Sequence, residues 1–447
     1  MLILQNFINV IFWECTRSCL RFLAGDRATE VSFGRFLGNR KVTVTEIESS
    51  LAQRTEKACQ EGDPVLLIQD TVECGYPRQP LKKALFGHTS DSQTQGFFMH
   101  PAIAVNAQTL ELLGLGAVDV WTRTEAPGKA KDRGKKPTQQ KESRRWIEVP
   151  NRAKERLTQA SQITVIGDQE SDLFDLFWQV PDARTEVLIR AHHNRETAEG
   201  SRIYDYLAQL EVKDRLTVEV PAIAGVRTER RAQLEVRYGS LELRCPDSSQ
   251  YQQAPASIAV SVIDVREQPA SVPPGEDPIQ WLLITTHRVN TNAQARQMIH
   301  FYCARWSVEQ VFRTLKKQGF DLEQSQIQTP ESMKKFSVIL LGGAIKVMQL
   351  THARDGKSEQ SAEVAFDDNE VDLLTQLNDQ LTGTTEKQRN PFLAGSLAWA
   401  SWVIARLGGW KGYPSERPAG PITMYRGLAV FEAQLQGWLL AKKVCIP

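Results

Sequence analysis

The stretch PVLLIQD, residues 64–70, decides the fold, because an unbroken apolar run leads directly into a carboxylate. A short apolar run of this kind is typical of a strand that is buried on both faces of a sheet. The stretch ITVIGD, residues 163–168, repeats the pattern and again ends in Asp. We therefore predict an α/β fold in which two buried strands end at Asp70 and Asp168, at an edge of the sheet.

Hydrophobic spacing extends this prediction along the chain. Strands are predicted at 97–105, 110–122 and 187–191, and helices at 143–160, 170–179, 292–318 and 331–354. Residues 201–288 show period-two alternation, at Leu234, Val236 and Tyr238 and again from Leu241, which predicts an inserted β-domain. Residues 355–390 are predicted to be an acidic linker, and a helical, Trp-rich tail follows it.

These elements divide the chain into five predicted regions. They are a shortened N-terminal helical region at 1–60, a first core part at 61–198, a β-rich insertion at 199–288, a second core part at 289–355 and a C-terminal helical region at 356–447.

The net charge of +1, from 54 basic and 53 acidic residues, does not by itself mark a nucleic-acid binder. Residues 123–156, however, hold twelve Lys or Arg against five Asp or Glu and predict a basic loop. The seven cysteines include no CxxC pair, which favours the reducing cytoplasm and excludes a zinc site of ordinary spacing. Residues 1–13 are apolar but too short to span a bilayer, so we expect a docking helix there, or a misassigned start codon.

The stretch FYCARWSVEQVFRTLKKQG, residues 301–319, carries the strongest chemical signal. At about 100° per residue, Tyr302, Arg305, Glu309 and Lys316 fall within an arc roughly 60° wide on one helix. One carboxylate, two cations and a phenol thus share a stripe beside the apolar face. A surface ion pair between Arg305 and Glu309 is the plain alternative, as is a turn or cap role for each aspartate.

Three carboxylates that converge would suit hard divalent cations, which prefer oxygen ligands. Two such ions about 4 Å apart can activate a water or hydroxyl and stabilise the leaving oxygen of a phosphodiester. Asp70, Asp168 and Glu309 are therefore predicted to bind metal, with Arg305 and Lys316 clamping phosphates.

The spacing Tyr-x2-Arg-x3-Glu-x6-Lys resembles the YREK signature of DDE transposases of the insertion-sequence-four family. Four further motifs support the resemblance: QDT at 69–71, GDQESD at 167–172, WLLIT at 281–285 and IARLGGW at 404–410. The resemblance implies an RNase H-like core interrupted by a β-rich insertion, with flanking N- and C-terminal helical regions. It also implies that the N-terminal region is a remnant of a DNA-recognition domain and that the C-terminal region forms a homodimer.

By this resemblance Asp70, Asp168 and Glu309 are the catalytic ligands of two Mg²⁺ ions, for which Mn²⁺ can substitute. DNA-binding roles are implied for one further set of side chains, namely Tyr302, Arg305, Lys316, Trp281, Arg144, Arg145 and Arg190. Trp281 resembles the residue that stacks on a flipped-out base when the DNA end forms a hairpin. Weaker carry-overs are Lys141, Trp146, His192, Arg195 and Trp306, for which surface charge or packing is the alternative.

The implied activity is cut-and-paste transposition of a bacterial insertion sequence, by phosphodiester hydrolysis and strand transfer through a hairpin. The expected partners are double-stranded DNA, at transposon ends and target, and a second copy of the chain, without a membrane. We expect a cytoplasmic, nucleoid-associated protein. Gln169 and Gln310 depart from the family pattern, as does the shortened N-terminus, so a truncated, non-catalytic DNA-binding or inhibitory protein is the alternative, and a structure-selective nuclease is a third.

Overall fold

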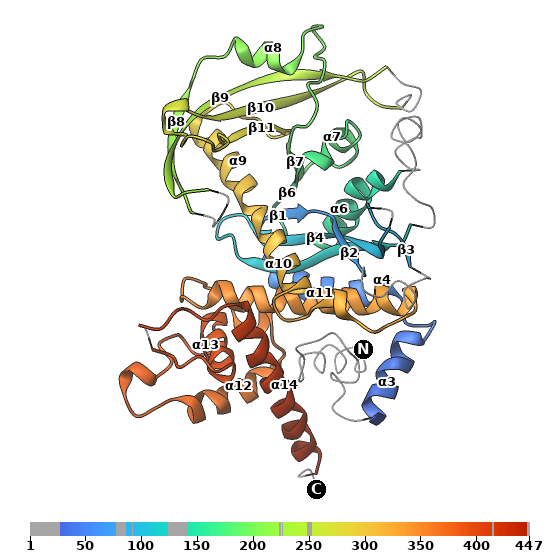
Figure 1. Cartoon of the computed structure of the whole chain (residues 1–447), viewed down its shortest axis with the longest axis vertical. Helices are drawn as coiled ribbons and strands as arrows, with labels where there is room; N and C mark the ends of the chain where they lie inside the picture. The colour runs from blue at the N-terminus through green and yellow to red at the C-terminus, as the bar shows by residue number, and fades with distance from the viewer. Residues whose placement is uncertain are drawn as a thin grey trace.

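The computed structural model describes residues 27–76, 86–91, 93–123, 141–222, 225, 227–247, 253–413 and 415–444. The predicted docking helix at 1–13 and most of the basic loop, 124–140, lie outside these residues. One mixed sheet forms the centre of the molecule, and helices cover its two faces (Figure 1). The predicted α/β class is confirmed.

Five strands make the part of the sheet that carries the two aspartates. They are β1 (Pro64–Gln69), β4 (Gln95–Asn106), β5 (Leu112–Trp121), β6 (Gln162–Gly167) and β7 (Thr185–Arg190). β1 pairs with β6 in parallel and with β4 antiparallel, β5 pairs with β4 antiparallel, and β7 pairs with β6 in parallel. The order β5-β4-β1-β6-β7 is consistent with the predicted RNase H-like core. Two short strands, β2 (Val72–Gly75) and β3 (Gly87–His88), pair with β4.

β1 is buried because its side chains alternate between two apolar layers. Leu66 and Ile68 pack into one core cluster, with the helices α4 (Val44–Ala58), α10 (Trp306–Lys316) and α11 (Pro330–Ala353). Val65 and Leu67 pack into the other, with α6 (Arg145–Arg156) and the short α7 (Leu176–Gln179). The continuous apolar run of 64–69 therefore reflects burial on both faces.

The predicted insertion extends the same sheet. Its strands are β8 (Asp214–Val220), β9 (Arg230–Arg244), β10 (Ser257–Glu267) and β11 (Gln280–Thr285), and it also holds the short helix α8 (Ile203–Ala208). β11 pairs with both β10 and β7, so the insertion strands follow the core strands in one hydrogen-bonded order. The assignment of 199–288 as a domain remains a prediction.

α11 lies between the sheet and the C-terminal helices, as Figure 1 shows. By length and composition it is the one helix among the described residues that could cross a membrane, but 89% of its most apolar window is buried inside the protein. Apolar side chains lie all around this helix because it packs against the sheet on one side and against the C-terminal helices on the other. Its Gly342 packs against Leu51, whose Cδ2 would lie 2.8 Å from an added Cβ, so the Leu51 side chain would have to shift.

The remaining helices are α3 (Arg27–Gly38), α9 (Asn292–Ala304), α12 (Asp368–Leu381), α13 (Leu397–Leu407) and α14 (Pro421–Val444). α12 begins at an Asp367–Glu370 capping box and buries Leu373 and Leu374. The prediction of an acidic linker at 355–390 is therefore wrong: the acidic residues cap and cover a helix that packs against the C-terminal helices. The predicted helix at 170–179 is also wrong in extent, because only α7 and a single turn at 169–171 form there.

A buried carboxyl group, that of Glu432, lies among three of these helices. Glu432 of α14 is 1% exposed, and neither of its carboxylate oxygens has a hydrogen-bond partner among the described residues. Lys346 of α11 pairs instead with Glu370 of α12, at 3.1 Å. Burial, with the charge of Glu370 as the next cause, raises the pKa of Glu432 well above its usual range.

Replacing Glu432 with Gln is expected to stabilise the protein by about 1 kcal/mol at pH 8, because the amide has no proton to lose. A raised pKa in the folded state gives stability that is full below the unfolded value and is lost as pH rises. The gain should therefore disappear near pH 4. Urea unfolding at both pH values measures it, with the exposed Glu363→Gln as a neutral control. Equal stability of the Glu432→Gln and unaltered proteins at pH 8 would contradict this account.

Candidate active site

The two strand-end aspartates lie side by side because β1 and β6 are parallel neighbours. Ile68 pairs with Ile166, so the residues that follow each strand, Asp70 and Asp168, leave the sheet at the same edge. The Asp70 side chain is 17% exposed. Burial, and then the negative charge of Asp168, raises the pKa of Asp70 to about 7. Two carboxylates thus share a poorly hydrated site.

Glu309 approaches this pair from the helical layer. The Arg305 guanidinium donates one hydrogen bond to Asp70 Oδ2 at 3.1 Å and another to Glu309 Oε1 at 2.6 Å. The helix is interrupted at Arg305, between α9 and α10, but this residue keeps helical angles of φ −52° and ψ −31°. The side chains of the predicted stripe at 302–316 therefore keep one direction across the interruption. Arg305 bridges Asp70 and Glu309 through its two hydrogen bonds.

The donor set fits a divalent cation in chemistry. Carboxylate oxygens are the ligands that hard cations prefer, and burial together with the charge of Asp168 raises the pKa of Asp70, which a bound cation would counteract. As placed, however, no three His, Cys, Asp or Glu side chains among the described residues are close enough to hold a metal ion. Arg305 supplies the positive charge between Asp70 and Glu309. A metal held by both carboxylates would therefore require Arg305 to release at least one of them.

A buried histidine supports the Asp70 segment. His100 Nε2 lies 3.1 Å from Gln69 Oε1, and its Nδ1 lies 2.8 Å from Thr71 Oγ1. Gln69 Nε2 donates to the carbonyl of Trp146, so its Oε1 accepts and His100 carries its proton on Nε2. The Thr71 hydroxyl then donates to Nδ1. Burial lowers the pKa of His100 to about 3, which keeps this ring neutral.

Two residues of this site, His100 and Glu170, are absent from the predicted set. The backbone N–H of Glu170 donates a hydrogen bond to Asp168 at 2.9 Å. Burial and the charge of Asp168 raise the pKa of Glu170. The motif GDQESD contains Glu170, so that signal was available, whereas His100 sits in an apolar stretch, FFMHPAIAV, that predicts only a buried strand.

Tyr302 and Trp281 meet beside the carboxylates. Their rings make an edge-on contact with centroids 5.8 Å apart. Burial raises the pKa of Tyr302, and the nearby charges of Arg305, Arg190 and Asp168 also act on it. Arg190 donates to the carbonyl of Gln280 at 3.1 Å. The structure thus brings Tyr302, Trp281 and Arg190 to the Asp168 side of the site.

Lys316 lies farther along the same helix. Its Nζ donates to the carbonyl oxygen of Glu73 at 2.9 Å and pairs with Glu323 at 2.8 Å. This ammonium group therefore links α10 to β2. Trp306, which follows Arg305, is 51% exposed and offers a free aromatic surface.

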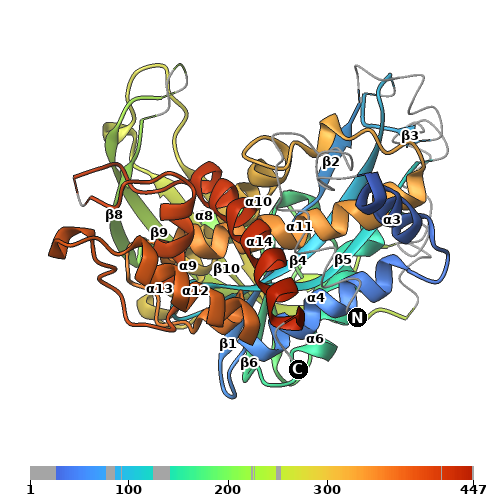
Figure 2. The ribbon, with the colours of Figure 1, turned by 90° about the horizontal axis from the view of Figure 1, so that it is seen from below.

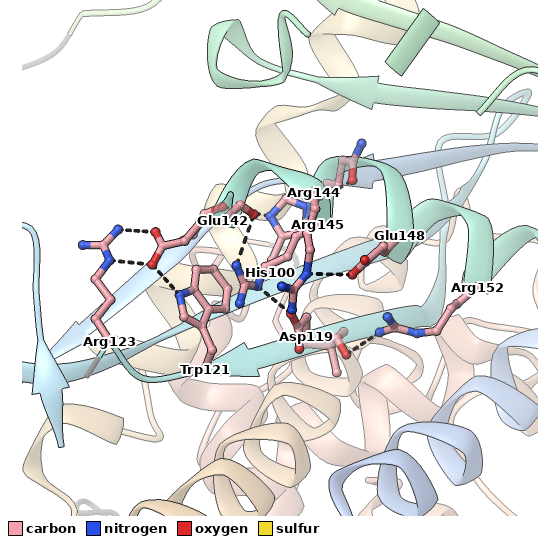
Figure 3. Close-up of polar contacts among 12 residues, drawn as sticks. His100, Asp119, Trp121, Arg123, Glu142, Arg144, Arg145, Glu148 and Arg152 are labelled. Atoms are coloured by element: carbon pink, nitrogen blue, oxygen red, sulfur yellow. Dashed lines mark hydrogen bonds and ion pairs between the residues drawn. The ribbon is translucent and has the colours of Figure 1, made fainter. Parts of the chain in front are cut away.

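The two predicted DNA-binding arginines at the start of α6 differ sharply (Figure 3). Arg144 has a side chain that is 40% exposed, and it pairs with Glu148 at 3.1 Å. Arg145 is buried, pairs with Asp119 and lies over the Trp121 ring at 3.6 Å. Its guanidinium is thus occupied inside the protein. Only Arg144 presents a cation at the surface.

Arg195 is likewise paired inside the protein, with the carboxylate of Asp172. Arg195 donates two hydrogen bonds to Asp172 Oδ1, at 2.8 and 2.7 Å. The backbone N–H groups of His192 and His193 donate to the other oxygen, at 2.8 and 2.7 Å. Arg195, a weaker candidate for DNA contact, therefore ties the segment after β7 to the turn that carries Asp168.

Comparisons with known proteins identify the family to which the chain belongs. Residues 79–342, more than half of the 447-residue chain, match the family described as transposase DDE domain. A similar solved structure is that of the piggyBac transposase in a synaptic complex with hairpin DNA, at 8% identity and a TM-score of 0.36. The match covers 68% of this chain and 51% of that one, so it spans about half the length of that transposase. The chain belongs to the transposase DDE domain family.

Proposed function

We propose that this chain is a cut-and-paste transposase of a bacterial insertion sequence, of the insertion-sequence-four family with the YREK signature. The observation that carries the proposal is the Arg305 guanidinium, which joins Asp70 to Glu309 next to Asp168. A strand-end pair and a helix distant in sequence thus supply one cluster in a chain of the transposase DDE domain family. The substrate is double-stranded DNA, and the working form is a cytoplasmic, nucleoid-associated homodimer.

Asp70, Asp168 and Glu309 would hold two Mg²⁺ ions, or Mn²⁺ in their place. Bound there, such ions would activate the attacking oxygen and stabilise the leaving one. Arg305, once it releases a carboxylate, has a planar guanidinium that can grip a DNA phosphate. His100 and Thr71 keep the Asp70 backbone in place through the hydrogen bonds described above.

Trp281 would provide the surface on which a flipped base stacks during hairpin formation. Its ring is only partly buried and is oriented by the edge-on contact with Tyr302. Stacking on an aromatic side chain is worth about 1–3 kcal/mol per base and offsets part of the cost of unstacking.

Trp281→Ala is therefore expected to reduce hairpin formation about tenfold or more while the first nick is retained. Denaturing gels of a labelled duplex with the element's end, sampled over time in Mg²⁺, separate nicked from hairpinned strands. Trp306→Ala is the comparison, because that exposed ring is not part of the contact with Tyr302. Equal loss of nick and hairpin in Trp281→Ala would show a structural role for this residue.

A second candidate function is a non-catalytic, DNA-binding or inhibitory relative. The pairing of Arg305 with both Asp70 and Glu309 favours it, since a side-chain cation already bridges two of the carboxylates that a metal ion would need. Such a protein would bind DNA and leave it uncut with Mg²⁺ or Mn²⁺. Detection of a nicked or hairpinned end excludes this candidate.

A further inference from the structure

A cavity of about 1190 Å³ lies outside the cluster of Asp70, Asp168 and Glu309, and none of these three residues lines it. Its walls come from α10, the end of α11, the turn between β4 and β5, and the segment that leads from α13 into α14. Figure 2 shows the beginning of α14 beside α10 and α11. The helix that carries Glu309 therefore forms one wall, through Gln310 and Arg313.

The charged side chains of this cavity are mainly basic. Five are Arg or Lys and three are acidic, and each acidic side chain has a partner within the protein, although Oε1 of Glu111 is buried without one among the described residues. Asp355 pairs with Lys357 at 3.5 Å, Glu416 accepts the backbone N–H of Lys411 at 2.9 Å, and Glu111 accepts the Thr109 hydroxyl at 2.9 Å. The cavity thus keeps an excess of positive charge.

Three arginines in this wall make no side-chain hydrogen bond or ion pair with the described residues. They are Arg313 on α10, Arg417 before α14 and Arg426 on α14, and all three are exposed. Cations from three separate segments face one hollow without an acidic partner. An arrangement of this kind suits a ligand that carries several negative charges along its length.

Two neutral features point to the same ligand chemistry. The helix α14 begins at Pro421 in the cavity wall and has no acidic residue in its first turn, so its unpaired amides favour an anion. Trp410 also lines the cavity, and its buried indole N–H has no acceptor among the described residues. A phosphate oxygen would satisfy such donors.

We propose that this cavity binds the phosphodiester backbone of a DNA segment beyond the point of cleavage. The volume is far larger than one phosphate requires, and the shared helix α10 connects the cavity to Glu309. The proposal rests on the proposed function and adds to it a second DNA-binding surface that contains none of the predicted site residues. A free phosphate or nucleotide would use the same chemistry, so the test separates the two.

The test compares the unaltered protein with the double variant Arg417→Ala/Arg426→Ala. Fluorescence anisotropy measures binding of a labelled duplex that ends at the cleavage point, and of one that continues about 20 base pairs beyond it, over a range of salt concentrations. For the long duplex the double variant should bind at least about tenfold more weakly, with a salt slope smaller by about two. For the short duplex the two proteins should bind alike.

The matched control is Arg215→Ala/Arg231→Ala, which removes two exposed arginines from β8 and β9. It should leave both duplexes bound as before. Circular dichroism melting confirms that both double variants are folded. An unchanged salt slope on the long duplex overturns the proposal, as does loss of inorganic phosphate or nucleotide binding by the double variant with DNA binding intact.

Cleavage of the short duplex keeps the two claims apart. If the unaltered protein cuts it in Mn²⁺ but both proteins bind the long duplex equally, the cavity proposal fails and the proposed function stands. If neither the unaltered protein nor the double variant cuts any DNA, but their salt slopes on the long duplex differ, the proposed function fails. The cavity is then still a phosphodiester-binding site.

Discussion

Replacing Asp70 with Asn is expected to reduce metal-dependent DNA cleavage by at least about a thousandfold and to make the metal-free protein more stable at pH 8. The loss follows because an amide is a weaker ligand for a hard cation than a carboxylate. The gain follows because burial and Asp168 raise the pKa of Asp70 to about 7 from the ordinary 3.8. Activity and stability therefore move in opposite directions at one residue.

The pH dependence of this gain has a definite sign. Below about pH 4, Asp70 is protonated in both the folded and the unfolded chain, and its full stability contribution is present. Between about pH 4 and 7 the unfolded chain has lost the proton and the folded chain still holds it, so stability falls as pH rises. This difference between the folded and unfolded pKa of Asp70 corresponds to roughly 4 kcal/mol, of which Asn should recover about 2–4 kcal/mol above pH 7.

Thermal unfolding in EDTA, at pH 4 and pH 8, measures the effect. Asp182→Asn is the control, because hydrogen bonding lowers the pKa of Asp182 to about 2 and the amide should not stabilise there. Added Mg²⁺ should raise the melting temperature of the unaltered protein and not that of Asp70→Asn. A lower melting temperature of Asp70→Asn at pH 8, without metal, would contradict the proposed origin of the shift.

Replacing Asp172 with Ala is expected to destabilise the protein by about 3–5 kcal/mol, which is the cost of leaving a buried ion unpaired. The Asp172 side chain is fully buried and that of Arg195 is 12% exposed. The change also leaves the backbone N–H groups of His192 and His193 without their acceptor. Because this contact fixes the turn after Asp168, cleavage should fall as well.

Urea unfolding measures this cost, and in thermal unfolding the melting temperature should drop by roughly 3–5 °C. Asp247→Ala is the matched control, since its ion pair with Arg244 is at the surface and Asp247 is 86% exposed. It should change stability by less than about 0.5 kcal/mol. If Asp172→Ala were as stable as Asp247→Ala, the buried pair would not hold the turn.

The sequence predicted the site best where local pattern and tertiary position coincide. The runs that end at Asp70 and Asp168 became parallel neighbours, and the stripe from Tyr302 to Lys316 kept its direction through the break at Arg305. Helical phase and strand ends are local properties, so one sequence reveals them. Which arginines pair with acids inside the protein is not a local property, so the sequence did not reveal that Arg145 pairs with Asp119 and Arg195 with Asp172.

The insertion shows where alternation misleads. Two period-two runs, up to Tyr238 and from Leu241, differ in phase by one residue, and both belong to β9. Tyr238 packs into one core cluster and Leu241 into the other, so the buried face of the strand changes between them. Gly239 allows this passage, because a Cβ there would lie 2.3 Å from the Tyr206 hydroxyl. The pattern recorded a change of face and not a turn.

The central claim is that Asp70, Asp168 and Glu309 cut DNA together with bound metal ions. The most direct measurement is cleavage of a labelled duplex carrying the element's inverted repeat by the unaltered protein and by Glu309→Gln, in Mg²⁺, in Mn²⁺ and in EDTA. The account predicts cutting by the unaltered protein with either metal, none in EDTA, and a loss of at least about a thousandfold in Glu309→Gln while DNA binding is retained. Undiminished cutting by Glu309→Gln, or cutting in EDTA, would contradict it.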